Sequence, residues 1–280
     1  MNKNRCMILV NSCDIYADVW DLFFAGIKAQ WSDCKYPIVL NTESKKYTND
    51  MNVQVHNYQP IPGKDCWGER YKKTLEDLNT EYVMPILEDF VLKEKFTGNE
   101  LIEQVMEWMD ENPNIGVFYL HKHPYVNQQA TEFPGFGIMP QRAEYKLTTC
   151  IGIWRKTYLE KCIKGFENPW EWEMYVTRHA WKLKEKEYAL LENQNEVYKF
   201  PWGGVIWRGL WHPEAKVLAE KYGINIDFSI RGFMDENDPY RIKERYSLRK
   251  HFPKDLAKSI FWSELKKRVI EKTRKIRCEI

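Results

Sequence analysis

Short apolar runs alternate with segments of helical periodicity over the first 120 residues, and this alternation constrains the fold more than any other feature. Strands that alternate with helices form a mostly parallel sheet with helices on both faces, so we predict an α/β fold. The expected strands cover residues 6–10, 37–40, 53–58, 82–87 and 115–120. The expected helices cover residues 17–31, 66–78 (with Asp65 as N-cap) and 99–111.

Polar residues follow three of these expected strands. They are Asn11, Ser12, Cys13 and Asp14 after the first, Asn41, Thr42 and Glu43 after the second, and Glu88 and Asp89 after the fourth. Because ligands bind beyond the carboxyl ends of the strands in such sheets, we expect these residues to line one crevice. The sequence contains neither a GxGxxG pattern nor a P-loop pattern, the usual markers of nicotinamide and nucleoside triphosphate sites.

The second half of the chain predicts a less regular arrangement. Residues 121–146 are expected to form a long loop, of the kind that is often functional. Strands are expected at 148–154 and 188–191, and helices at 157–164, 174–186 and 213–222. Seven cysteines without a CxxC pair predict free thiols in a reducing cytosol. Neither a signal peptide nor a membrane-spanning segment is predicted.

The charge of the chain is distributed unevenly. The sequence has 42 Lys and Arg against 40 Asp and Glu, a net charge of only +2. Residues 243–277 hold 13 Lys and Arg against 4 Asp and Glu, so this segment carries +9 and the remainder carries −7. Apolar residues recur within it at helical spacing, which predicts a basic amphipathic helix. Such a helix either binds an anionic membrane surface or packs on the domain with a solvated basic face.

Aromatic side chains are unusually frequent, with 12 Trp, 16 Tyr and 13 Phe. Many Trp and Tyr residues are typical of half-wet surfaces that stack on sugars or bases, and equally of an aromatic-rich core. We expect Trp67, Trp170, Trp172 and Trp202 to border a site and most of the others to lie in the core.

Three motifs are candidates for chemistry. Glu88 and Asp89 can hold a divalent cation that neutralises a diphosphate, or can form an acidic turn that ends the strand. In residues 170–173 (WEWE), a carboxylate framed by aromatic rings is a candidate base for a sugar hydroxyl, although these residues also suit the first turn of a helix. Trp67 and Arg70 suggest a stacking group with a cation for phosphate, or a core residue beside a surface charge.

The order of these motifs resembles that of bacterial GT-A-type glycosyltransferases of the family 2 kind, which act in polysaccharide and lipopolysaccharide biosynthesis. The resemblance rests on residues 11–14, 67–70, 82–90, 153–155, 169–173 and 203–209. It implies a GT-A fold, which is Rossmann-like, followed by a helical basic tail. It also implies a donor-binding half at 1–120, an acceptor-binding half of the same domain at 121–242, and the tail at 243–280.

The resemblance implies roles for individual residues. A nucleotide-sugar donor, expected to be a UDP-sugar, would contact Asn11, Ser12, Cys13, Asp14, Asn41, Thr42, Trp67, Arg70 and Glu88. Asp89 would hold Mn²⁺ or Mg²⁺, although the chain has Glu88-Asp89-Phe90 where the family has a DxD motif. Glu173, or Glu171 as second choice, would take a proton from the acceptor hydroxyl in an inverting single displacement. Trp170, Trp172 and Trp202 would contact a saccharide acceptor.

The expected acceptor is lipid-linked, and the expected location is cytoplasmic, peripheral on the inner face of the plasma membrane through residues 243–277. Nucleic acid is not an expected partner, because the basic charge is confined to the tail. Two other classes stay open. A glycoside hydrolase needs two carboxylates about 5–10 Å apart, which Asp89 could form with Glu171 or Glu173. A non-catalytic carbohydrate-binding protein would bind no nucleotide.

Overall fold

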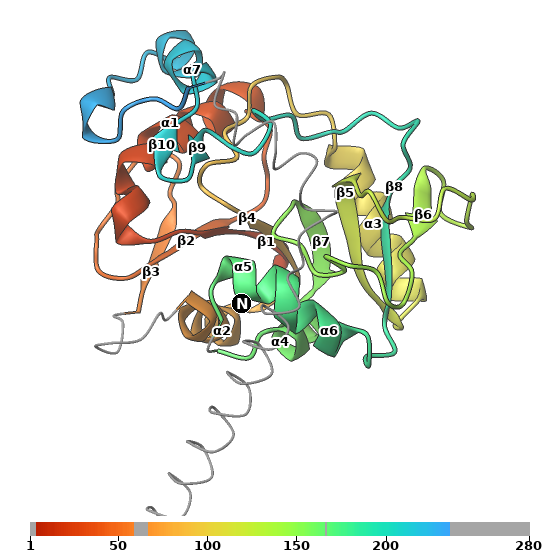
Figure 1. Ribbon diagram of the computed structural model, residues 1–280. Coiled ribbons are helices and arrows are strands. Elements are labelled where there is room, and N and C mark those ends of the chain that lie inside the picture. Colours follow the sequence, from red (N-terminus) through yellow and green to blue (C-terminus); the bar gives the residue numbers. More distant parts are fainter. Residues whose placement is uncertain (1–3, 59–66, 166, 236–280) are drawn as a thin grey trace, which may run out of the picture. The chain divides into compact units, whose positions relative to one another are not determined.

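An eight-stranded sheet organises the computed structural model, which describes residues 4–58, 67–165 and 167–235 (Figure 1). The strand order is β3-β2-β1-β4-β7-β5-β8-β6. The strands are β1 (Asn4–Asn11), β2 (Ile38–Thr42), β3 (Gln54–Asn57), β4 (Thr80–Ile86), β5 (Ile115–Lys122), β6 (Phe136–Ile138), β7 (Gly152–Arg155) and β8 (Lys186–Leu190). The chain divides into two units, Met1–Phe233 and Met234–Ile280, and all described helices and strands belong to the first.

Most strand pairs are parallel, which confirms the predicted class of sheet. β3, β2, β1 and β4 run parallel, as do β5 and β8, whereas β7 runs antiparallel between β4 and β5. β6 is antiparallel to β8 at the sheet edge. Because β7 runs in the opposite direction, its first residue, Gly152, pairs with Tyr119 near the carboxyl end of β5. The segment that precedes β7 therefore lies at the edge where β1, β4 and β5 end.

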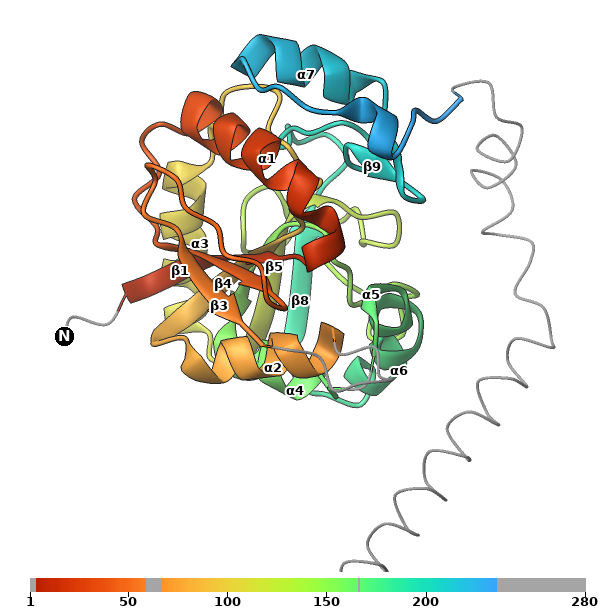
Figure 2. The same ribbon diagram turned by 90° about the vertical axis from the view of Figure 1, so that its left-hand side faces the viewer.

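Helices cover both faces of this sheet (Figures 1 and 2). They are α1 (Ala17–Gln30), α2 (Trp67–Asp77), α3 (Asn99–Glu111), α4 (Lys156–Cys162), α5 (Pro169–Glu171), α6 (Thr177–Ala180) and α7 (Glu214–Tyr222). Alternate residues of β1 enter different cores, as the two-residue period of a strand requires. Ile8 and Val10 belong to the core that contains α1, α3 and α7, whereas Met7 and Leu9 belong to the one that contains α2 and α4.

The predicted helix at 99–111 matches α3, and the other early elements differ from prediction by a few residues. Two later predictions were wrong. The helix expected up to residue 186 ends at Ala180, because Lys186 already pairs with β5 as the start of β8. The strand expected from residue 148 begins only at Gly152. The long loop at 121–146 is present but contains β6.

Some predictions concern residues beyond the described part of the chain. Asp65 and the basic segment 243–277 lie outside it, as do two cysteines. The five cysteines within it are free, as expected: Cys6, Cys13, Cys34, Cys150 and Cys162. Across residues 4–58, 67–165 and 167–235, no helix combines the length and the apolar character needed to cross a membrane.

Gly116 on β5 offers a test of how tightly the sheet packs on α4. A Cβ atom at this position would lie 2.2 Å from Cδ1 of the buried Tyr158. Gly116→Ala should therefore lower the free energy of unfolding by about 1–3 kcal/mol, the range typical of an overpacked core. Urea denaturation measures this difference. Gln104→Ala, at an exposed position of α3, is the control and should leave the midpoint unchanged. Equal midpoints for both variants would contradict this packing.

Candidate active site

The ends of β1 and β2 carry a buried pair of amides. Asn41 Nδ2 donates to Asn11 Oδ1 over 2.6 Å, and the backbone N–H of Ser12 donates to the carbonyl of Asn41 over 2.9 Å. Asn11 Nδ2 and Asn41 Oδ1 have no hydrogen-bond partner among the described residues. Buried polar atoms are normally hydrogen-bonded, so this donor and this acceptor are available to a ligand or a water molecule.

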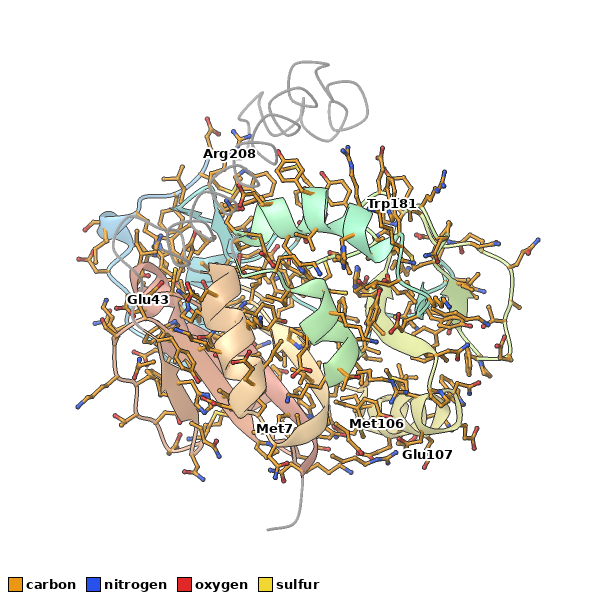
Figure 3. All side chains as sticks on the ribbon, turned by 90° about the horizontal axis from the view of Figure 1, so that it is seen from below. Met7, Glu43, Met106, Glu107, Trp181 and Arg208 are labelled. Atoms are coloured by element: carbon orange, nitrogen blue, oxygen red, sulfur yellow. The ribbon has the colours of Figure 1, made fainter. Side chains whose placement is uncertain are left out.

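Arg70 links the loops that follow β1 and β2. It is only 4% exposed, and its Nη1 forms an ion pair with Glu43 Oε1 at 2.6 Å. Its Nη2 donates to the carbonyl oxygen of Ser12 over 2.7 Å. Figure 3 shows Glu43 beside α2, the helix that carries Arg70. The guanidinium predicted to meet a phosphate thus has two of its nitrogens bonded within the protein.

Asp14 completes the same junction. Its backbone N–H donates to the Glu43 carboxylate, and its own carboxylate accepts hydrogen bonds from Ser44, Lys45 and Thr42. Burial by itself would raise the pKa of Asp14, but these hydrogen bonds outweigh it and hold the pKa well below its usual value. Asp14 is therefore a charged anchor of the loop after β2.

Glu88 and Asp89 follow β4 at the same edge of the sheet. Glu88 is buried and Asp89 is half-buried. Burial raises the pKa of both carboxyls, and the proximity of Asp89 raises that of Glu88 further. A hydrogen bond from Ser12 and the charge of Arg70 offset part of the shift at Glu88. Two adjacent carboxylates in a poorly hydrated position favour a cation or a shared proton.

The donor set at Glu88 and Asp89 fits a hard divalent cation that also binds substrate. Within residues 4–58, 67–165 and 167–235, no cluster of three or more His, Cys, Asp or Glu side chains is arranged to hold a metal. Mg²⁺ is commonly held by one or two carboxylates, with phosphate oxygens and waters as its other ligands. Asp89 has the donor type expected of it, and Glu88 can supply a second oxygen.

A glycine loop packs directly on Asp89. Gly204 has φ +85°, and a Cβ atom there would lie 2.2 Å from Asp89 Oδ2. The backbone N–H of Val205 donates to the carbonyl of Asp89 over 2.8 Å. The loop therefore fixes the position of Asp89, and this close approach requires a residue without a side chain.

Two tryptophans stand on the elements around this loop. The rings of Trp202 and Trp207 lie 5.6 Å apart and are inclined by 31°, and Trp202 is 51% exposed. Trp207 ends β9 (Ile206–Trp207), which pairs with β10 (Leu210–Trp211) through a two-residue turn. Arg208 and Gly209 in this turn have φ +51° and +83°, as a type I′ hairpin requires. The exposed Trp202 keeps a surface suitable for a sugar ring.

The two glutamates of the WEWE segment have different environments. Glu171 and Asn168 form a capping box, in which each side chain accepts a hydrogen bond from the backbone of the other. Glu171 therefore caps the start of α5. Glu173 lies on η2 (Trp172–Val176), a π-helical turn. This geometry distinguishes the two side chains, which the sequence alone left as alternatives.

The carboxylate of Glu173 is held through one oxygen. Its Oε1 accepts from Thr149 N at 2.6 Å, Thr149 Oγ1 at 2.8 Å and Thr148 Oγ1 at 3.1 Å, and Oε2 has no hydrogen-bond partner among the described residues. Burial raises the pKa of Glu173 above its usual value, although the hydrogen bonds from Thr149 and Thr148 lower it in part. An oriented carboxylate with a free oxygen and a raised pKa is suited to accept a proton.

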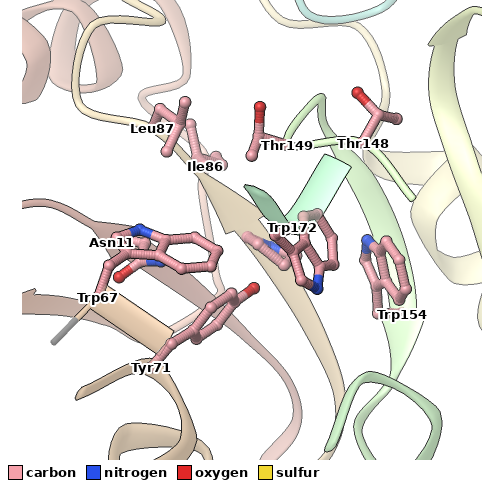
Figure 4. A pocket seen from close by; sticks show the side chains of 10 residues that line it. Asn11, Trp67, Tyr71, Ile86, Leu87, Thr148, Thr149, Trp154 and Trp172 are labelled. Carbon is pink, nitrogen blue, oxygen red and sulfur yellow. The ribbon is translucent and has the colours of Figure 1, made fainter. Parts of the chain in front are cut away.

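A small cavity lies beside these groups (Figure 4). It has room for about one water molecule. Its lining comes from five parts of the chain: Asn11, Trp67, Tyr71, Pro85, Ile86, Leu87, Thr148, Thr149, Trp154 and Trp172. The residues that end β1 and β4 thus meet those that precede β7.

Of the four tryptophans expected to border the site, Trp67 and Trp172 pack in the protein interior. Trp172 is 2% exposed, its Nε1 donates to the carbonyl of Cys162, and its ring lies between those of Trp67 and Trp154. Trp67 is also buried, at 7% exposed. Neither offers the open face expected for stacking on an acceptor or a base. Trp170, at 66% exposed, does offer one.

Cys150 lies within electrostatic range of three acidic groups. Burial is the main cause that raises the pKa of its thiol, and the charges of Glu173, Glu196 and Asp89 raise it further. Glu196, whose Oε1 accepts from the backbone N–H of Lys122, was not predicted. Thr148 and Thr149 were also missed, because nothing in the sequence indicates that they precede an antiparallel strand at this edge.

Neither protein-family models nor curated proteins gave a match to the chain. Solved structures share its fold at low identity. S. aureus TarS 1-349 is 14% identical, with 81% of this chain and 68% of that chain covered and a TM-score of 0.46. A cytidylyltransferase from Leptospira borgpetersenii is 13% identical, with 70% and 79% covered and a TM-score of 0.43. The 2-C-methyl-D-erythritol 4-phosphate cytidylyltransferase of Thermus thermophilus is 14% identical, with 77% and 97% covered and a TM-score of 0.43. At this distance the matches assign no activity, which must be argued from the site.

The contact between Gly204 and Asp89 can be tested with a matched pair of variants. Gly204→Ala places a methyl group against the carboxylate and strains the backbone, whereas Gly209→Ala strains the backbone at a similar φ with nothing within 4 Å. Gly209→Ala should cost about 1 kcal/mol of unfolding free energy and Gly204→Ala about 1–3 kcal/mol more. Urea denaturation of both variants gives the difference. Equal costs would show that Gly204 does not press on Asp89.

Proposed function

We propose that this chain is a glycosyltransferase that moves a sugar from a nucleoside-diphosphate sugar to a saccharide hydroxyl. The observation that carries the proposal is the convergence of two different acidic groups at one edge of the sheet. The buried Glu88 and the half-buried Asp89, a pair suited to a cation, follow β4, while Glu173, a single oriented carboxylate, is held by the segment before β7. The resemblance of the motif order to GT-A-type enzymes supports the same assignment.

Glu173 is proposed to activate the acceptor, and Glu88 with Asp89 to hold the cation beside the leaving diphosphate. The first step is deprotonation of an acceptor hydroxyl by Glu173 through the free Oε2. The hydroxyl oxygen then forms a bond to the anomeric carbon while the bond from that carbon to the diphosphate oxygen breaks, and the proton stays on Glu173. This single displacement inverts the anomeric configuration. Thr148 and Thr149 hold the base in place during proton transfer.

The donor is proposed to lie across the ends of β1, β2 and β4. Asn11 Nδ2 and Asn41 Oδ1 offer a donor and an acceptor for the nucleoside part of a UDP-sugar. Asp89, with Glu88, would hold Mn²⁺ or Mg²⁺, and a bound ion would supply positive charge against the diphosphate. Arg70 is proposed to position the loops of Ser12 and Glu43, since its bonds to them engage two of its nitrogens.

The acceptor is proposed to lie on the side of Asp89 where the glycine loop carries Trp202. This ring is exposed and rests beside Trp207, and the loop hydrogen-bonds to the backbone of Asp89. Aromatic faces of this kind pack against the apolar faces of sugar rings. We propose a lipid-linked saccharide as acceptor, because the basic segment 243–277 would hold the enzyme on an anionic membrane that carries such a lipid.

Glu173 and Glu171 provide a matched test of the base. Glu173→Gln keeps an acceptor oxygen for Thr149 and removes the charge, so nucleotide binding should persist while transfer falls by about 10²–10⁴-fold. Glu171→Gln should retain near-normal transfer, because Gln also completes a capping box. The measurement is release of nucleoside diphosphate from a panel of nucleotide sugars with saccharide acceptors. Near-normal turnover by Glu173→Gln would refute the assignment.

The raised pKa of Glu173 predicts the acidic limb of the pH profile. The base must be deprotonated, so kcat/KM should fall as the pH decreases through a pKa that lies above the ordinary value of a glutamate, about 4.3. Replacing Thr149 by Val removes a hydroxyl that stabilises the carboxylate and should move this limb to higher pH. An unchanged limb in Thr149→Val would mean that another group controls it.

Nucleotide binding separates the enzyme from the two competing classes. A ligand that binds only the native state at 100 times its dissociation constant adds about 2.7 kcal/mol of stability. We expect UDP with Mn²⁺ to raise the melting temperature of the wild type, and Asp89→Asn to lose the part of the shift that depends on Mn²⁺. Hydrolysis of a glycoside without any nucleotide sugar would favour a glycoside hydrolase. Saccharide binding without a nucleotide shift would favour a carbohydrate-binding protein.

A further inference from the structure

Large apolar side chains are exposed on three neighbouring segments of the first unit. Ile15 is 74% exposed, Ile230 71%, Phe233 42% and Leu210 40%. Ile15 belongs to η1 (Asp14–Tyr16), Leu210 to β10, and Ile230 to η3 (Phe228–Ile230). We call these four side chains the apolar rim. Single exposed apolar residues are ordinary, but a group on adjoining segments indicates an interaction surface.

Arg231 fixes the three segments to one another. Its Nη2 donates to the carbonyl of Ile15, its Nη1 to that of Gly209 over 3.4 Å, and its Nε forms an ion pair with Asp18 at 2.6 Å. The guanidinium also lies 4.8 Å from the centre of the Tyr16 ring. Figure 2 shows η1, the β9–β10 hairpin and the segment after α7 together at one side of the unit. The bonds of Arg231 therefore hold the segments that carry the apolar rim in fixed positions relative to one another.

The base of the apolar rim is close to the candidate site. η1 begins three residues after the end of β1. Burial raises the pKa of Tyr16, and the charges of Glu88 and Asp89 raise it further. The hydrogen bond to Asp18 is the main cause that raises the pKa of Arg231, and the charge of Glu88 raises it further. A partner that binds the apolar rim would thus lie near the carboxylates proposed to bind the donor.

We propose that the apolar rim inserts into an anionic phospholipid surface, as a membrane contact separate from the basic tail. The described chain ends at Asp235, two residues after Phe233, and the sequence beyond it carries +9 over residues 243–277. Stable attachment of a peripheral protein takes two signals, and one chain that carries both an exposed apolar group and a cationic segment can supply both. A lipid-borne acceptor would then meet the site at the membrane surface. The contact itself does not depend on sugar transfer.

The test uses the full chain and vesicles of phosphatidylcholine with phosphatidylglycerol. Ile15→Ser/Ile230→Ser removes the two most exposed side chains of the rim. Val217→Ser is the matched control, because Val217 is 62% exposed but lies on α7, outside the rim. Co-sedimentation should show about tenfold weaker binding for the double variant, as expected when two isoleucines are withdrawn from an apolar boundary. The control should bind like the wild type.

Two further readouts make the result specific. In the wild type, vesicles should slow amide hydrogen exchange in residues 13–18 and 228–233. Wild-type binding by the double variant, or unchanged exchange in both segments, overturns the proposal. A wild-type dimer that the double variant converts to monomers also overturns it, because the rim would then be a subunit interface. The UDP-dependent thermal shift should be equal in all three proteins, so failure of the lipid contact is distinguishable from failure of the proposed enzyme function.

Discussion

The ion pair between the buried Arg70 and the half-buried Glu43 underlies the arrangement of the loops at the proposed donor side of the site. Arg70 reaches from α2 to the loop after β2 and, through the carbonyl of Ser12, to the loop after β1. Removing one partner of a fully buried pair typically costs about 3–5 kcal/mol, and this pair is worth less because water reaches Glu43, although loss of Glu43 would still leave the buried guanidinium without its counter-charge. The two loops are therefore fixed before any ligand arrives, which reduces the ordering cost of binding.

The carboxylates that follow β4, unlike the ion pair of Arg70 and Glu43, have no full counter-charge among the described residues. Glu88 and Asp89 are close together, poorly hydrated and only partly compensated by Ser12 and Arg70. This arrangement costs stability in the absence of a cation, and the packing of Gly204 on Asp89 prevents the side chain from moving away. The repulsion between these two poorly hydrated carboxylates favours any ligand that brings positive charge. Binding energy is therefore available where the substrate is proposed to react.

Local sequence patterns predicted most of the elements but few of the side-chain roles. Helical periodicity was sufficient for α3, because its buried face repeats regularly. It failed beyond Ala180, where pairing with β5 overrides local propensity. The spacing of Glu171 and Glu173 could not separate them, since only the capping geometry assigns one to the helix end. Burial of Trp172 likewise depends on residues distant in sequence.

The antiparallel strand β7 has a consequence for how the chain acquires its structure. β4 and β5 are not neighbours, because β7 separates them and pairs with both. The first 120 residues alone would leave the edges of β4 and β5 without their partner, and unpaired edges invite association with other chains. Closure of the sheet must await residues 152–155, a long-range step of the kind that slows folding. Residues 4–58 and 67–122 therefore share one sheet with residues 152–155 and 186–190, and the two halves of the sequence complete each other's pairing.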